Sequence, residues 1–162
     1  MSNEQDKNSQ NDGENLFNSA LEYLQLSLRT YVTANMILDK LFATRLVVVA
    51  LSMATDFILK CLSDESFNLS SNIYSEEEED ISQYQDRLVD LRNLSESINI
   101  IEKGKIEELI VIYEIAVKTL ASLNKKNPYP TLLALNFKEF QNQAMMFVLS
   151  SKTIVNDFLM LQ

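Results

Sequence analysis

The chain has 162 residues, a formal net charge of −9 and 46% hydrophobic residues, but two glycines, two prolines, one cysteine and no histidine or tryptophan. Average usage at this length would give roughly 11 glycines and 8 prolines. This shortage excludes β-sandwiches, which need frequent turns, and doubly wound α/β folds, which need glycine-rich loops. The hydrophobic content excludes a disordered chain. We therefore expect one all-α domain, an up-and-down type bundle of four to five long helices with coiled-coil-like seams.

Residues 1–14 are polar, and Gly13 is the one conformationally special residue among them. We expect a disordered tail here, followed by a single helical domain over residues 15–162. No basic region followed by an apolar segment is present, so no signal peptide is visible. The single Cys61 cannot form an intramolecular disulfide, and it predicts a reducing, cytoplasmic environment.

Apolar residues at helical spacing predict a first helix over about residues 15–40. Its apolar stripe includes Leu28 and Tyr31 and then meets the polar Asn35. A buried Asn at such a position fixes the register or oligomeric state of paired helices, whereas an exposed one shows that the stripe has drifted into solvent. The sequence leaves both interpretations of Asn35 open.

A second helix, over about residues 45–62, is apolar nearly all round, as is typical of the central helix of a bundle. Charged residues leave ten uncharged ones between Leu46 and Thr55, too few for a membrane span. No glycine or proline separates this helix from the first one. We expect a turn near Ala43–Thr44 with Thr44 as N-cap, and the alternative is one continuous helix of about 50 residues.

Residues 63–75 have the composition of a loop, and the sequence does not decide whether this loop is a hairpin or a crossover. A third helix is predicted over about residues 76–103. Ser75 and Glu78 have the spacing of a capping box at its start, and acidic residues fill its first turns, where they interact favourably with the helix dipole.

Gly104 follows Lys103 as a glycine after the last turn of a helix does, and the heptad stripe slips by one residue there. We therefore expect a turn at Gly104 and a fourth helix over about residues 105–124. The segment Asn124–Pro130 is the clearest loop in the chain. A fifth helix, with the longest unbroken apolar stripe, is expected over residues 131–162.

The absence of histidine removes the commonest general base and the commonest metal ligand. It excludes Ser-His and Cys-His nucleophile pairs, the usual zinc and di-iron sites of helices, and a His-ligated haem. Because no phosphate-binding glycine loop is present either, we expect no enzymatic activity, no cofactor and no metal site. A carboxylate enzyme would have to use the acidic residues near apolar faces, namely Asp56, Glu107, Glu114 and Asp157.

Asp56 is the most notable of these acids because it lies in the most apolar helix. Lys60 follows it four residues later, a spacing that allows an ion pair along one helix edge. We expect that structural role for Asp56 rather than catalysis.

Residues 1–14 carry a net charge of −3, and residues 64–80 carry seven acidic residues and no basic one, whereas the rest of the chain is close to neutral. The run at 76–80 is therefore a candidate docking site for a basic protein partner, with a solvated helix start as the plainer interpretation. Its members are Glu76, Glu77, Glu78, Glu79 and Asp80. Side chains on a helical turn point in several directions and do not close a calcium cage. No basic patch predicts nucleic-acid binding.

Five long apolar stripes exceed what a compact monomer needs, so a homodimer is expected. The candidate interface residues come from the first and last helices, and they are Leu28, Tyr31, Asn35, Phe140 and Phe147. The preferred function is a non-enzymatic protein–protein interaction module, an adaptor, regulator or assembly component. The alternative is a bundle that holds an apolar small molecule between the helices over residues 45–62 and 131–162.

Overall fold

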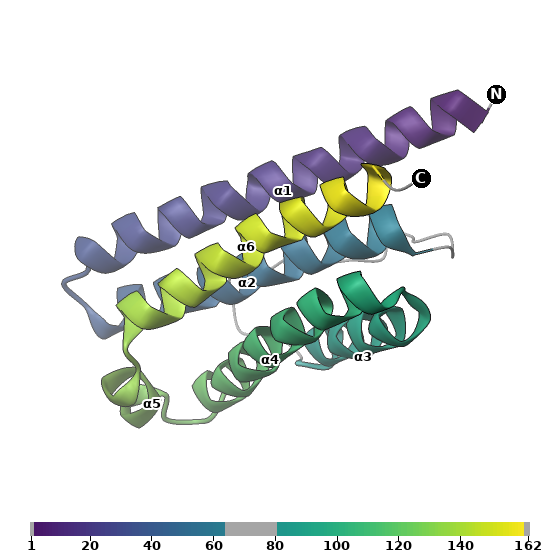
Figure 1. The fold of residues 1–162 in the computed structure, drawn as a ribbon. Coiled ribbons are helices and arrows are strands. Elements are labelled where there is room, and N and C mark those ends of the chain that lie inside the picture. Colours follow the sequence, from purple (N-terminus) through teal and green to yellow (C-terminus); the bar gives the residue numbers. More distant parts are fainter. Residues whose placement is uncertain (1, 64–80, 161–162) are drawn as a thin grey trace.

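The computed structural model describes residues 2–63 and 81–160, and the side chains of residues 12–63, 81–99 and 102–160. Within these ranges it contains six helices and no strand, which confirms the all-α bundle (Figure 1). The helices are α1 (Ser2–Val32), α2 (Ile37–Leu62), α3 (Ser82–Ser97), α4 (Ile100–Leu123), α5 (Tyr129–Ala134) and α6 (Phe137–Met160).

Helix α2 is the central helix of the bundle, and every side chain from Leu46 to Leu59 is buried. Helices α1 and α6 pack along one side of α2, and the α3–α4 hairpin packs along the other (Figure 1). By length and composition α2 would be apolar enough to cross a membrane, but 89% of its most apolar stretch is buried inside the bundle. Its all-round apolar character therefore has a sufficient explanation in the packing of this fold.

The break between the first two helices lies at residues 33–36, so both the turn predicted near Ala43–Thr44 and the continuous helix are wrong. Thr44 is buried within α2, and its hydroxyl donates a hydrogen bond to the Lys40 carbonyl oxygen at 2.8 Å. The chain instead turns directly after Val32, the last residue of α1, which is 72% exposed although the neighbouring Tyr31 still packs on Phe137 of α6. Asn35 is exposed in this connection, so it fixes no register between helices within the single chain, and its role at an oligomer interface stays a prediction.

Residues 2–14 belong to α1, so the prediction of a disordered tail is wrong for this segment. Gly13 is buried, and a Cβ placed on it would lie 3.0 Å from Cys61 Sγ and 3.2 Å from Phe57 Cδ1. The missing side chain allows α1 to approach α2 closely. On either side of this contact, Asp12 pairs with Lys60 and Glu14 with Lys152.

The α3–α4 connection lies at residues 98–99, so the turn predicted at Gly104 is wrong. Gly104 lies inside α4, and a Cβ on it would meet nothing within 4 Å. The side-chain oxygen of Asn99 accepts a hydrogen bond from the Glu102 amide at 3.3 Å and thereby caps α4. The break that explains the shifted heptad stripe therefore lies at residues 98–99, more than one helical turn before Gly104. The predicted capping box at Ser75 lies outside the described residues.

The apolar stripes predicted for α3 and α4 do face the core. Their buried members are Tyr84, Leu88, Leu91 and Ser95 in α3, and Ile106, Leu109, Tyr113, Ala116, Leu120 and Leu123 in α4. Helical periodicity therefore identified the buried faces of both helices although it misplaced their boundary.

The predicted helix over residues 131–162 is instead divided into the short α5 and the long α6, with a break at residues 135–136. Asn136 caps α6, because its side-chain oxygen accepts a hydrogen bond from the Glu139 amide at 3.1 Å. The start of α6 is held on the end of α1 by Phe137, whose ring stacks on Tyr31 with centroids 3.9 Å apart. Leu133, which precedes the break, is 67% exposed and does not continue the stripe of α6.

Candidate functional site

The outer face of α4 is the starting point of the candidate site. The buried residues of α4 lie on one face of the helix, but apolar residues also occupy positions outside that face. As a result Val111 and Ile115 are left 57% and 56% exposed. They lie one helical turn apart on the same face, so they form a short apolar ridge beside α6.

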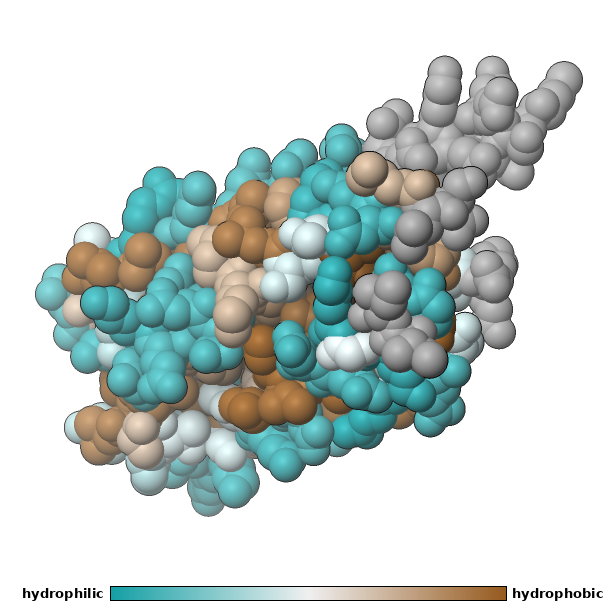
Figure 2. All heavy atoms as spheres, in the orientation of Figure 1, coloured by the Kyte–Doolittle hydropathy of each residue, from teal (hydrophilic) through white to brown (hydrophobic). Residues whose placement is uncertain are grey.

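A cavity of about 490 Å³ lies between this ridge and the start of α6. Leu51 of α2 contributes to its lining from the core. The remaining lining residues are Val111, Ile112, Ile115, Ala134, Leu135, Asn136, Glu139, Phe140 and Gln143. Figure 2 shows hydrophobic side chains exposed across the middle of this face, along α6 and α4.

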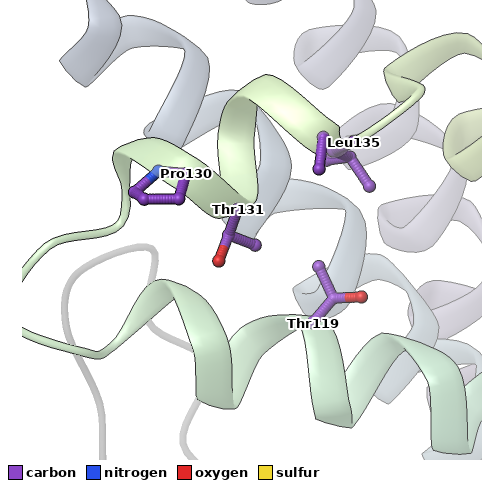
Figure 3. Close-up of a pocket in the computed structure, with 5 residues that line it drawn as sticks. Thr119, Pro130, Thr131 and Leu135 are labelled. Carbon is purple, nitrogen blue, oxygen red and sulfur yellow. The ribbon is translucent and has the colours of Figure 1, made fainter.

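A second hollow, of about 420 Å³, lies between α5 and α4 (Figure 3). It is lined by Thr119, Pro130, Thr131, Ala134 and Leu135. Figure 3 shows Thr131 directed from α5 toward α4, where Thr119 lies opposite. Ala134 and Leu135 line both hollows, so the two lie next to each other along α4, and we call them together the α4–α6 groove.

The charge of the groove comes from one side chain. Among the described residues that line it, Glu139 is the only charged one, and it forms no ion pair within the described part of the chain. Its position is set by the Asn136 cap, which holds the first turn of α6 against the break from α5. The groove is therefore an apolar surface with a single carboxylate at its edge.

The four acids considered for catalysis are separated, and three of them are engaged in ion pairs. Asp56 is completely buried and accepts hydrogen bonds from Arg87 Nε at 3.1 and 3.2 Å, so the predicted pairing with Lys60 is wrong. Lys60 Nζ instead lies 3.8 Å from a carboxylate oxygen of Asp12. Burial explains why Asp56 pairs with Arg87, because an isolated carboxylate inside the core is far costlier than one paired with a guanidinium.

The other three acids lie at the surface. Glu114 pairs with Arg92 at 3.2 Å, and Asp157 pairs with Lys105 at 3.1 Å. Glu107 is exposed on α4. In the described part of the chain, no three acidic or cysteine side chains gather in a way that could hold a metal ion.

The predicted oligomer-interface residues lie in three different environments. Phe147 is completely buried and Tyr31 is stacked on Phe137, so these two serve the core of the chain itself. Phe140 is partly buried and lines the α4–α6 groove. Leu28 and Asn35 are exposed near the α1–α2 connection. The predicted docking run, Glu76–Asp80, lies outside the described residues.

Arg87 and the groove were not anticipated from the sequence. A signal for Arg87 does exist, because it lies three residues after Tyr84 and four before Leu91, on the apolar face of α3. A basic residue on an apolar stripe and an acid in an apolar helix together indicate a buried ion pair. For the groove, the signal is the run of apolar residues at 109–113, which is wider than one buried stripe needs.

Two other buried groups, the Cys61 thiol and the Tyr113 hydroxyl, have raised pKa values that make them unreactive near neutral pH. Burial raises the pKa of the Cys61 thiol from 9.0 to about 11, although nearby Lys60 and Lys152 act in the opposite direction. Burial likewise raises the pKa of Tyr113, whose hydroxyl lies 3.2 Å from that of Ser52. Neither group is set up as a nucleophile or a base near neutral pH.

No known protein family, curated protein or solved structure that was compared matches the chain. Functional inference therefore depends on the groove and on the surface of the bundle.

Proposed function

We propose that the protein is a non-enzymatic protein–protein interaction module and that the α4–α6 groove receives an amphipathic helix of a partner protein. The observation that carries the proposal is the apolar ridge of Val111 and Ile115 standing beside an apolar hollow of about 490 Å³. Exposed apolar surface gathered round a hollow is typical of binding sites. Its shape supports a helix as the ligand, because grooves between helices accept apolar anchors spaced three, four and seven residues apart.

The length of the groove supports the same ligand. From Val111 to Thr119 the groove follows α4 over nine residues, and the eight steps between them correspond to about 12 Å or two helical turns. Two turns of a bound helix present two or three apolar side chains on one face. These would enter the hollows on either side of Leu135.

The charge of the groove supports a basic partner. Glu139 offers a free carboxylate at the edge, and a lysine or arginine flanking the apolar anchors would pair with it. The chain as a whole carries a charge of −9, which attracts a basic partner from a distance. Glu76–Asp80 are part of that charge and remain, as a sequence-based proposal, a segment that steers such a partner.

A pair of synthetic helical peptides tests the proposal. Both carry leucines at positions i, i+4 and i+7, one with flanking lysines and the other with flanking glutamates. We expect the lysine peptide to bind the full chain and to shift NMR amide signals along α4, α5 and the start of α6. The glutamate peptide should bind at least about tenfold more weakly, the equivalent of one charge pair of about 1.4 kcal/mol.

Two variants localise the binding. Ile115→Asp places a charge on the exposed ridge and should abolish binding of the lysine peptide, whereas Leu149→Asp, at a similarly exposed position of α6 that does not line the groove, should leave it unchanged. Equal sensitivity of both variants, signal shifts elsewhere on the bundle, or no binding of either peptide would overturn the proposal.

An apolar small molecule is the second candidate, because about 490 Å³ lies within the size range of ligand cavities. The cavity also has walls from α2 and α6, the region that the sequence predicted for such a ligand. A medium-chain fatty acid such as dodecanoate serves as the probe. A rise in Tm with dodecanoate that disappears in Ile115→Asp, together with no binding of either peptide, would favour this second function.

A further inference from the structure

The end of the bundle at the α1–α2 connection has an unusual concentration of exposed apolar side chains. Seven of the sixteen large hydrophobic residues that are most exposed in the described chain lie between residues 26 and 42. Six of them form what we call the end patch, namely Leu28, Val32, Met36, Ile37, Leu38 and Phe42. Figure 2 shows hydrophobic side chains at the end of the molecule where Figure 1 places this connection.

The end patch lies beside the buried face of α1, which α6 covers up to the last turn through the stack of Phe137 on Tyr31. Leu24 and Ser27 are completely buried on that face, whereas Leu28 and Val32 at its edge are 42% and 72% exposed. On α2, Leu38 is 63% exposed, and full burial begins at Ala43. Monomeric proteins expose single hydrophobic side chains routinely, but six of them at one helix–helix connection are a concentration that is typical of an interaction site.

The charges beside the end patch have both signs. Arg29 lies on the last turn of α1, and Asp39 lies on the first turn of α2. In the part of the chain that the structure describes, neither forms an ion pair. The third charged residue there, Lys40, lies 5.6 Å above the ring of Tyr31. The surroundings of the end patch thus carry two cations, Arg29 and Lys40, and one anion, Asp39, and a surface with both signs is suited to contact with a second copy of itself.

We propose that the end patch is the interface of a homodimer, formed by a second copy of this chain about a two-fold axis. In such an interface residue i of one subunit contacts residue j of the other, and the reverse contact occurs as well. Arg29 therefore faces Asp39 of the partner subunit, and Asp39 faces Arg29 of the partner subunit, on either side of the joined apolar residues. A uniformly basic or acidic partner would leave one of these charges beside a like charge.

The distribution of charge along the bundle also favours contact at this end. A chain of net charge −9 repels its copies, so a homodimer is least hindered where the acidic residues are fewest. Within α1, Asp12 and Glu14 lie toward the opposite end of the bundle (Figure 1). The dimer of the two bundles thus keeps these acids apart.

This arrangement revises the interface that the sequence predicted. Leu28 and Asn35 remain at the interface, but they meet the second copy at the end of the helical hairpin rather than along a coiled-coil seam. The α4–α6 groove takes no part in the interface, so this inference does not depend on the proposed function.

Sedimentation velocity of the full chain, up to high-micromolar concentration, measures the oligomeric state. We expect a dimer whose Kd rises at least about tenfold in Arg29→Glu, because this change sets acid against acid twice per dimer. Asp39→Arg should weaken the dimer in the same way by setting base against base. The double variant Arg29→Glu/Asp39→Arg restores opposite charges and should recover most of the lost affinity, which a purely structural effect of either change would not do.

Val32→Asp tests the apolar part and should abolish the dimer, with Val89→Asp as the matched control because Val89 is similarly exposed on α3 away from the end patch. Circular dichroism checks that each variant remains helical. A chain that is monomeric at every concentration, a dimer unaffected by Val32→Asp, or a double variant weaker than both single ones would overturn the proposal.

Discussion

Arg87 Nε of α3 lies 3.1 Å from Asp56 Oδ1 and 3.2 Å from Asp56 Oδ2 of α2, inside the core of the bundle. The Asp56 side chain is completely buried and that of Arg87 is 4% exposed. The ring of Tyr84 lies beside the guanidinium, with its centroid 5.7 Å from Arg87 Cζ. Because water is excluded from both charges, the pair ties the position of α3 to that of α2.

Removing one member of this pair should be strongly destabilising. We expect Asp56→Ala or Arg87→Ala to lower the free energy of unfolding by about 3–5 kcal/mol, because the remaining charge would be buried without its partner. Urea unfolding followed by circular dichroism measures the loss. The double variant Asp56→Leu/Arg87→Met should be much more stable than the sum of the two single losses implies. Additive losses would show that the two residues act independently.

The thiol of Cys61 should react slowly in the folded protein. Burial raises its pKa from 9.0 to about 11, so the reactive thiolate is about a hundredfold scarcer near neutral pH than at an unperturbed cysteine. The rate of reaction with a disulfide reagent should therefore be at least about a hundredfold higher after unfolding in urea. Equal rates in the folded and unfolded protein would contradict the burial of this side chain.

The same shift makes stability depend on alkaline pH. The folded pKa of Cys61 is raised above the unfolded value of 9.0, so its contribution is fully present below pH 9 and is lost as the pH rises toward about 11. Tyr113 acts in the same direction above pH 10, because burial raises its pKa as well. Cys61→Ala should reduce the fall in the free energy of unfolding between pH 9 and 10. An unchanged fall in the free energy of unfolding in Cys61→Ala would show that other titratable groups cause it.

The two glycines should respond oppositely to substitution by alanine. Gly104→Ala lies inside α4 with open space around the new methyl group and should stabilise the protein by about 0.5–1 kcal/mol. Gly13→Ala gains the same helix propensity but places a Cβ 3.0 Å from Cys61 Sγ. We expect a net loss of up to about 2 kcal/mol, because overpacking outweighs propensity. Thermal unfolding of both variants measures the difference, and a gain in Gly13→Ala would contradict the close approach of α1 to Cys61 and Phe57 at this residue.

The break between α5 and α6 should depend on Asn136. Asn136→Ala removes the side-chain oxygen that accepts the Glu139 amide and should cost about 1 kcal/mol. Asn136→Asp retains an acceptor and should cost little, which makes it the matched control. Because Asn136 and Glu139 both line the α4–α6 groove, the alanine variant should also weaken binding of the lysine peptide. Equal stability of the two variants would show that the Asn136 cap is not what causes the break between α5 and α6.

Several features follow from the sequence because they depend on local composition and spacing. The scarcity of glycine and proline and the lack of histidine predict helices and exclude whole classes of chemistry. Helical periodicity correctly placed Leu91, Tyr113 and Ile154 in the core, since residues three and four apart share one face whatever lies opposite them. These conclusions need no knowledge of how the helices pack.

Tertiary structure decided where the helices end and which residues meet. The breaks at residues 33–36, 98–99 and 135–136 depend on which apolar turns other helices cover, and helix propensities are too small to fix that. Asp56 could find Arg87 through packing alone, because its partner lies 31 residues away and the nearby Lys60 has a different neighbour. In the same way, Val111 and Ile115 differ from the buried residues of α4 because none of the described helices covers their side of α4.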